Sequence, residues 1–209
     1  MHPEYAPVLK DKIADILKSE IFLGNIKDGE SLTQEIISEK LGVSRMPVRE
    51  AFLQLESDGI LERLKNRHVK VNGMTAKRVV QIFDALSVFE ISLVGQADKA
   101  EVVESAFHAY ETAVPLQGKS ICIQKMMAFH LSFSESMDNL YLHQIHKKMI
   151  MGYPMFLLRQ YELDWRTLLR LNTEVYEAYL SKDARRISAS ILDFYKMLSD
   201  FALKECYIE

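Results

Sequence analysis

The sequence predicts a mainly α-helical protein in two parts, an amino-terminal winged helix-turn-helix domain (residues 1–73) and an all-α helical bundle (residues 74–209). Apolar side chains recur at helical spacing along most of the chain. Runs typical of β-strands occur only between Ile60 and Val71, and almost nothing after Gly73 has the pattern of a strand. A chain of 209 residues, 48% of them hydrophobic, has room for one large or two small domains.

Two helices are expected before residue 42. The apolar face of the first, which ends near Gly24, consists of Leu9, Ile13, Ile16, Leu17 and Ile21. Residues 25–29 read as a turn. Thr33 then caps a short second helix, whose apolar residues are Ile36, Ile37 and Leu41.

The third helix is the one expected to enter DNA. Ser44 is a good N-cap, because its hydroxyl can accept a backbone N–H of the first turn, so the helix begins at Arg45. Its buried stripe is Val48, Phe52 and Leu55, and Gly59 ends it. Arg45 and Arg49 lie four residues apart on another face, where both guanidinium groups can reach a base edge or a phosphate.

A β-hairpin with a basic tip is expected after the third helix, with strands near residues 60–64 and 69–71 and a tip at residues 65–68. Such a hairpin is the wing of a winged helix-turn-helix. The predicted DNA contacts of the helix and wing together are Ser44, Arg45, Met46, Arg49, Arg63, Lys65, Arg67, His68 and Lys70.

The segment LGVSRMPVREA, residues 41–51, resembles the GntR family of bacterial transcriptional regulators. Met46 departs from the family pattern, which has threonine there, and a thioether cannot donate the hydrogen bond that a hydroxyl gives to a phosphate. His68 stands where family wings usually have glycine, which alters close approach to the minor groove. The resemblance implies a homodimer that binds a palindromic operator in double-stranded DNA.

Overall charge does not favour DNA binding. The net charge is −3, and residues 1–74 contain eleven Lys and Arg against twelve Asp and Glu. The cations that contact DNA must therefore be concentrated locally, and we expect modest, salt-sensitive electrostatic affinity.

Six helices are expected in the second domain, the first capped by Thr75 and containing Val79, Phe83 and Leu86. The others are expected at residues 97–113, 121–137, 140–159, 163–181 and 183–206. Their order is similar to the helical ligand-binding (FCD-type) domain of the FadR-type branch of the GntR family. This resemblance depends on Phe129-His130, on Asp138-Asn139 and on the segment EAYLSKDA at residues 177–184.

In that branch an aspartate and three histidines hold a divalent metal, which in turn holds a carboxylate effector. The matching positions here are Met126, His130, Asn172 and Phe194. One imidazole with a thioether, an amide and a phenyl ring does not make a stable site, so we expect no metal and no cofactor. A weaker alternative combines His143 and His146 with His130; otherwise the first two are exposed helix residues.

These four positions are instead expected to belong to a pocket for an apolar or aromatic effector, because methionine and aromatic residues are frequent in the helices that contain them. The candidate pocket residues are Met126, His130, Arg159, Asn172 and Phe194. The competing interpretation is that these residues only close the core and that no effector exists.

Other functional classes find little support. Cys122 and Cys206 have no metal-type or disulfide-type spacing, and no segment reads as a signal peptide or membrane span, so a cytoplasmic protein is expected. No phosphate loop, nucleophile elbow, HExxH pair or paired carboxylates indicate an enzyme. The predicted function is a sequence-specific transcriptional regulator, with repression as the expected sense. The alternative is a helical small-molecule- or metal-binding protein whose amino-terminal domain no longer binds DNA.

Overall fold

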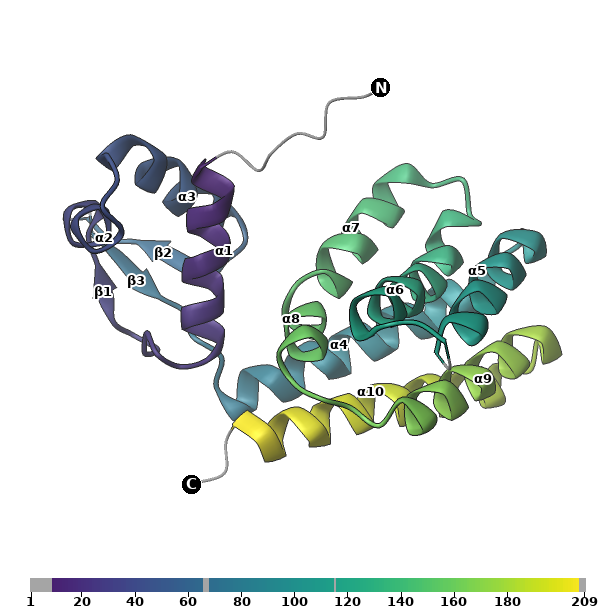
Figure 1. Cartoon of the computed structure of the whole chain (residues 1–209). Helices are drawn as coiled ribbons and strands as arrows, with labels where there is room; N and C mark the ends of the chain where they lie inside the picture. The colour runs from purple at the N-terminus through teal and green to yellow at the C-terminus, as the bar shows by residue number, and fades with distance from the viewer. Residues whose placement is uncertain (1–8, 66–67, 115, 207–209) are drawn as a thin grey trace. The chain divides into compact units, whose positions relative to one another are not determined.

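The computed structural model describes residues 9–65, 68–114 and 116–206 (Figure 1). The chain divides into two compact units, Met1–Thr75 and Ala76–Glu209. The chain is mainly helical, with its few strands in the first unit, as the sequence predicted.

The first unit contains helices α1 (Leu9–Phe22), α2 (Gln34–Leu41) and α3 (Arg45–Ser57). Helix α1 packs on α3, because the apolar stripe of each is buried. The stripe residues of α1 are Ile13, Leu17 and Ile21, and those of α3 are Val48, Phe52 and Leu55. Thr33 caps α2 as expected, since its hydroxyl accepts the backbone N–H of Ile36 at 3.2 Å.

The described part of the first unit also contains three short strands: β1 (Ser31–Leu32), β2 (Leu61–Arg63) and β3 (Val69–Val71). They form an antiparallel sheet in the order β1-β3-β2, with Glu62 opposite Lys70 in the β2–β3 hairpin. The wing was predicted. Strand β1 was not, because two residues are too few to show an alternating pattern.

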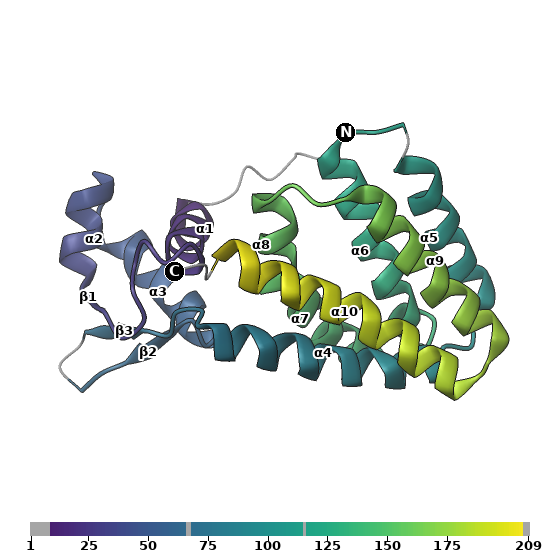
Figure 2. The same cartoon turned by 90° about the horizontal axis from the view of Figure 1, so that it is seen from below.

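The second unit consists of seven helices in the part of the chain that is described. They are α4 (Ala76–Gln96), α5 (Ala100–Ala113), α6 (Lys119–Glu135), α7 (Leu140–Ile150), α8 (Tyr153–Gln160), α9 (Trp165–Ser181) and α10 (Ala184–Cys206). Figure 2 shows α4 and α10 side by side along their length, and this is the most extensive helix pairing of the unit. Helix α5 packs on α6, and α9 packs on α10.

The prediction of one continuous helix over residues 140–159 was wrong. The segment 140–159 forms two helices, α7 and α8, which are separated at Met151 and Gly152. Pro154 lies at the start of α8, where its missing N–H costs nothing, but the same ring would break a continuous helix. The helix predicted from residue 97 begins at Ala100 instead.

Helix α4 is the one helix among the described residues that is long and apolar enough to cross a membrane by length and composition. Its buried residues pack against α10 and α6, as those of a core helix in a helical bundle do. They include the charged residue Glu90, which has no exposed surface.

Candidate DNA-binding surface and buried polar cluster

The first turn of α3 presents a polar surface. Ser44, Arg45, Met46 and Arg49 are all exposed, whereas Val48 on the other face of the helix is fully buried. Ser44 occupies the N-cap position, but its hydroxyl makes no capping hydrogen bond, contrary to our expectation. The surface therefore has a hydroxyl and two guanidinium groups directed away from the core, the groups that proteins use to contact phosphates and guanine.

Two arginines of the predicted DNA-binding surface, Arg45 and Arg63, are each paired with a carboxylate. Arg45 forms an exposed ion pair with Glu35 of α2. Arg63 of β2 donates from Nε and Nη2 to the two carboxylate oxygens of Glu56 in α3, at 3.0 and 2.6 Å. Neither pair was anticipated, because the partners lie seven and ten residues apart on different elements. The pairs show how arginines can be concentrated in a domain with no net positive charge.

The wing places three of its predicted contacts at the surface and one partly inside. Arg63, Lys65 and Lys70 are exposed, and His68 is half-buried. Arg67 lies outside the described residues. Lys65 and Lys70 are therefore exposed toward a phosphate backbone, while Lys70 also faces Glu62 across the hairpin and Arg63 is paired with Glu56.

Four of the five predicted effector-pocket residues lie in the core of the second unit. Met126, His130, Asn172 and Phe194 are buried, and the ring of Phe194 stacks on His130 with centroids 4.4 Å apart. Arg159 does not join them, because it is exposed near the end of α8.

The ring of His130 donates hydrogen bonds from both nitrogens. Nδ1 faces the Glu90 carboxylate, and Nε2 lies 2.7 Å from Oδ1 of Asn172. The Asn172 amide is oriented by its Nδ2, which donates to the Leu168 carbonyl at 2.8 Å, so Oδ1 is the atom that faces the histidine. A carboxylate and an amide oxygen only accept hydrogen bonds here, so both ring nitrogens must carry a proton and the imidazole is positively charged.

Glu90 is the centre of this cluster. Its second oxygen accepts a hydrogen bond from the Tyr195 hydroxyl and lies 3.5 Å from Nε2 of His146. Burial alone raises the pKa of Glu90, but the charges of His130 and His146 and the hydrogen bond with His130 outweigh it and lower the pKa to about 2. Burial, together with the negative charge of Glu90, raises the pKa of Tyr195 well above its ordinary value. The cluster is thus an ion pair of Glu90 and His130 inside the helical unit.

A serine links this cluster to a third histidine. The Ser134 hydroxyl lies 3.0 Å from Nδ1 of His143 and 2.9 Å from Nδ1 of His146. The expectation that His143 and His146 are both exposed was wrong: His146 is fully buried and His143 is half-buried. His146 lies inside the unit because its ring packs edge-on against Phe89 of α4.

Sequence reasoning missed Glu90 as a member of the site. The signal was its position at helical spacing after three apolar residues of α4, all of which are buried: Val79, Phe83 and Leu86. A glutamate on the buried face of a helix needs a partner, and that partner is His130.

These residues do not fit a bound divalent metal. Within the described ranges, no group of three or more His, Cys, Asp or Glu side chains could hold a metal ion. His130, the one ligand type retained at the four family positions, has both nitrogens committed to Glu90 and Asn172. A protonated imidazole has no lone pair to offer a metal.

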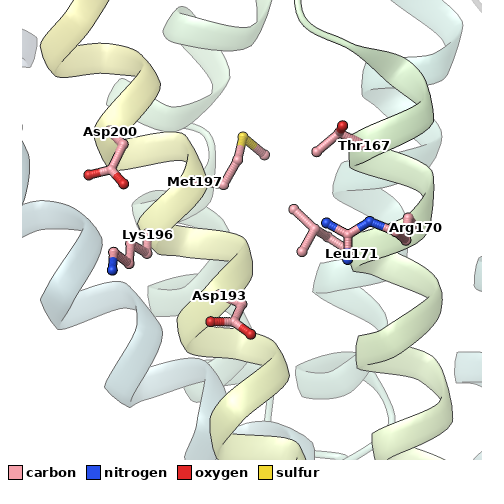
Figure 3. Close-up of a pocket in the computed structure, with 7 residues that line it drawn as sticks. All are labelled: Thr167, Arg170, Leu171, Asp193, Lys196, Met197 and Asp200. Carbon is pink, nitrogen blue, oxygen red and sulfur yellow. The ribbon is translucent and has the colours of Figure 1, made fainter.

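A shallow groove lies elsewhere on the second unit, between α9 and α10 (Figure 3). Its volume is about 360 Å³, and it is lined by Thr167, Arg170, Leu171, Asp193, Lys196, Met197 and Asp200. None of the predicted pocket residues borders it. Its acidic and basic groups are exposed, and Arg170 is paired with Glu174, so the groove does not select one ligand charge.

The first unit is similar to known proteins. Residues 9–71 match the family of bacterial regulatory proteins called the gntR family. The chain is 34% identical over 104 residues to the uncharacterized HTH-type transcriptional regulator YdhC of Bacillus subtilis, covering 47% of this chain and 46% of that protein. It is 35% identical over 79 residues to the gluconate operon transcriptional repressor of Bacillus subtilis, covering 38% of this chain and 32% of the repressor. The matches thus span less than half the length of these relatives.

Solved structures share the fold along nearly the whole chain. A structure described as "Lar controls the expression of the Listeria monocytogenes agr system and mediates virulence" has a TM-score of 0.74 at 19% identity, covering 97% of this chain and 100% of that one. The structure of E. coli McbR/YncC has a TM-score of 0.61 at 17% identity, with 96% and 99% covered. At these identities the likeness concerns the fold alone. Residues 9–71, which contain α1, α2, α3 and the strands, are thus similar to the gntR family of bacterial regulatory proteins.

Proposed function

We propose that this protein is a sequence-specific DNA-binding regulator of transcription, acting as a repressor in the bacterial cytoplasm and by binding rather than by catalysis. The observation that carries the proposal is the exposed pair Arg45 and Arg49 on the first turn of α3, within a domain that matches the gntR family. Several of the relatives, including the gluconate operon repressor, are named as repressors.

At the DNA, the surface residues divide into two groups. Arg45 and Arg49 read base edges in the major groove, because a guanidinium forms a two-pronged contact with guanine. The Ser44 hydroxyl and the wing cations Lys65 and Lys70 hold phosphates, which fixes the position of α3 without carrying sequence information. Arg45 must leave Glu35 to make its contact, so base reading replaces an ion pair by hydrogen bonds to a neutral base edge.

The proposed assembly is a homodimer. Two copies related by a two-fold axis present two α3 helices to the two halves of a palindrome, and this doubles the number of bases read. A ligand that prefers one arrangement of the dimer changes operator affinity by the ratio of its affinities for the two arrangements.

The first experiment is selection from a randomised duplex library at two salt concentrations, followed by sequencing of the bound fraction. Enrichment of one short palindrome supports the proposal. Binding that is salt-sensitive but unselective, or no binding at all, contradicts it.

Single substitutions then test the base contacts. Arg45→Ala and Arg49→Ala should each cost about 1–3 kcal/mol on the selected duplex and little on random DNA. Arg185→Ala, which removes an exposed arginine from the second unit, is the charge-matched control and should leave both affinities unchanged. Equal losses on selected and random DNA would refute base reading by these residues.

A further inference from the structure

The Glu90 carboxylate is surrounded as a bound anion would be. Its side chain has no exposed surface, and polar side chains reach it from three other helices: His130 of α6 and Tyr195 of α10 by hydrogen bonds, and His146 of α7 at ion-pair distance. His130 supplies the balancing positive charge and is itself held in orientation by Asn172 of α9. Converging donors and a counter-charge in a dry interior are the features that a carboxylate receptor requires.

One ring nitrogen of the cluster has no hydrogen bond. His146 Nε2 is fully buried and lies within ion-pair distance of Glu90, yet within the described structure it makes no hydrogen bond. Its ring is held from the other side, where Ser134 contacts Nδ1. His146 is therefore directed at the carboxylate position by the fold around it and not by a bond to Glu90 itself.

We infer that the centre of the helical unit is a carboxylate-binding site that the chain fills itself, with Glu90 of α4 as the bound carboxylate. The donors belong to α6, α7 and α10, so they remain in place when the Glu90 side chain is removed. The emptied site should then bind a small free carboxylate of matching size. This inference stands on the contacts within the helical unit and does not depend on DNA binding.

Two truncations of Glu90 match two probe ions. Glu90→Ala removes one methylene and the carboxylate, which leaves room for formate. Glu90→Gly also removes Cβ and leaves room for acetate. We expect about 100 mM sodium formate to raise the melting temperature of Glu90→Ala by ~3 °C or more over sodium chloride at the same concentration. Acetate should do the same for Glu90→Gly, and neither salt should affect the wild type.

Melting is followed in the full-length chain by the fluorescence of Trp165. It is the chain's single tryptophan and begins α9, so its signal reports the helical unit. Should a truncated variant be unfolded in chloride, circular dichroism during titration with the probe ion replaces melting. Recovery of helical signal then supports the inference, and failure to recover overturns it.

A matched control separates a carboxylate site from an unspecific cavity. Leu86→Ala creates a cavity one turn earlier on α4, at a fully buried apolar position. It should show no preference for formate over chloride. Adding His130→Ala to Glu90→Ala should abolish the formate effect. Equal responses of the Leu86 and Glu90 variants, or no response of either Glu90 truncation, would overturn the inference.

A consequence for regulation follows where the proposed function holds. Because the site is already filled and its histidine protonated, wild-type binding to the selected duplex should be unchanged by EDTA, by added divalent metal and by formate or acetate at matched ionic strength. The melting experiment needs no DNA, so its result is distinguishable from a failure of the proposed DNA-binding function.

Discussion

Replacing Glu90 by glutamine keeps the volume and shape of the side chain but removes its charge. The change leaves the protonated His130 buried without a counter-ion, and it offers the Tyr195 hydroxyl an amide in place of a carboxylate. We therefore expect Glu90→Gln to destabilise the helical unit without creating a cavity. Breaking a buried pair by removing one partner is costly for this reason.

The magnitude follows from the pKa of Glu90. This pKa falls from the ordinary 4.5 to about 2 in the folded chain. A tenfold change in proton affinity corresponds to about 1.4 kcal/mol, so the ionised carboxylate contributes about 3 kcal/mol to the free energy of unfolding at neutral pH. Solvent does not screen the interaction of Glu90 with His130, because both side chains are fully buried.

The sign of the pH dependence follows from the lowered pKa. A group with a lowered folded-state pKa stabilises the protein fully above its unfolded pKa, here 4.5, and loses this contribution as the pH falls through the folded value. The difference between wild type and Glu90→Gln should therefore be about 3 kcal/mol at pH 7 and about 1 kcal/mol at pH 3.

Urea unfolding followed by Trp165 fluorescence measures this difference in the helical unit at each pH. Ser92→Ala, an exposed change on the same helix, is the control and should leave the unfolding midpoint almost unchanged at both pH values. A difference below about 1 kcal/mol at pH 7, or one that does not shrink at pH 3, would refute the ionised Glu90–His130 pair.

Further predictions concern the first unit. Glu35→Gln frees Arg45 from its carboxylate, so affinity for the selected duplex should rise more than affinity for random DNA, measured by fluorescence anisotropy; an unchanged ratio of the two affinities would show that the ion pair does not restrain Arg45. Met46→Thr adds a hydroxyl donor at an exposed position, so it should tighten binding to all duplexes alike, and a gain on one sequence only would contradict phosphate contact. Thr33→Ala removes the cap of α2 and should lower the free energy of unfolding of this unit by about 1 kcal/mol in urea, whereas Thr33→Ser should not.

The first unit was predictable because its signals are local. The stripe Val48, Phe52 and Leu55 repeats every turn, and the cap Thr33 lies directly before its helix, so a short window of sequence contains the information. Strand β1 escaped notice because its existence depends on pairing with β3, about forty residues later. The carboxylate partners of Arg45 and Arg63 escaped for the same reason, since they belong to other elements.

In the second unit, the sequence predicted which residues lie in the core near Glu90 better than it predicted what they do there. Met126, His130, Asn172 and Phe194 were chosen by position and lie in the core. Their interpretation as a ligand pocket could not include Glu90, which is 40 residues from His130 and 105 from Tyr195 in sequence. Periodicity identifies which face of a helix is buried, but it does not identify the group on another helix that the face meets. Gly152 and Pro154 indicated the break between α7 and α8 in the sequence. The regular apolar spacing on both sides of it nevertheless predicted one continuous helix.

The pairing of α4 with α10 also sets the order in which this chain can fold during synthesis. Glu90 and its donor Tyr195 are 105 residues apart, so α4 leaves the ribosome roughly 5–20 s before the helix that covers it, at ordinary rates of translation. The contacts of the first unit close over much shorter separations, and that unit can fold in the meantime. During this interval α4, the one described helix that is long and apolar enough to cross a membrane, lacks its partner, and its apolar face is exposed to aggregation.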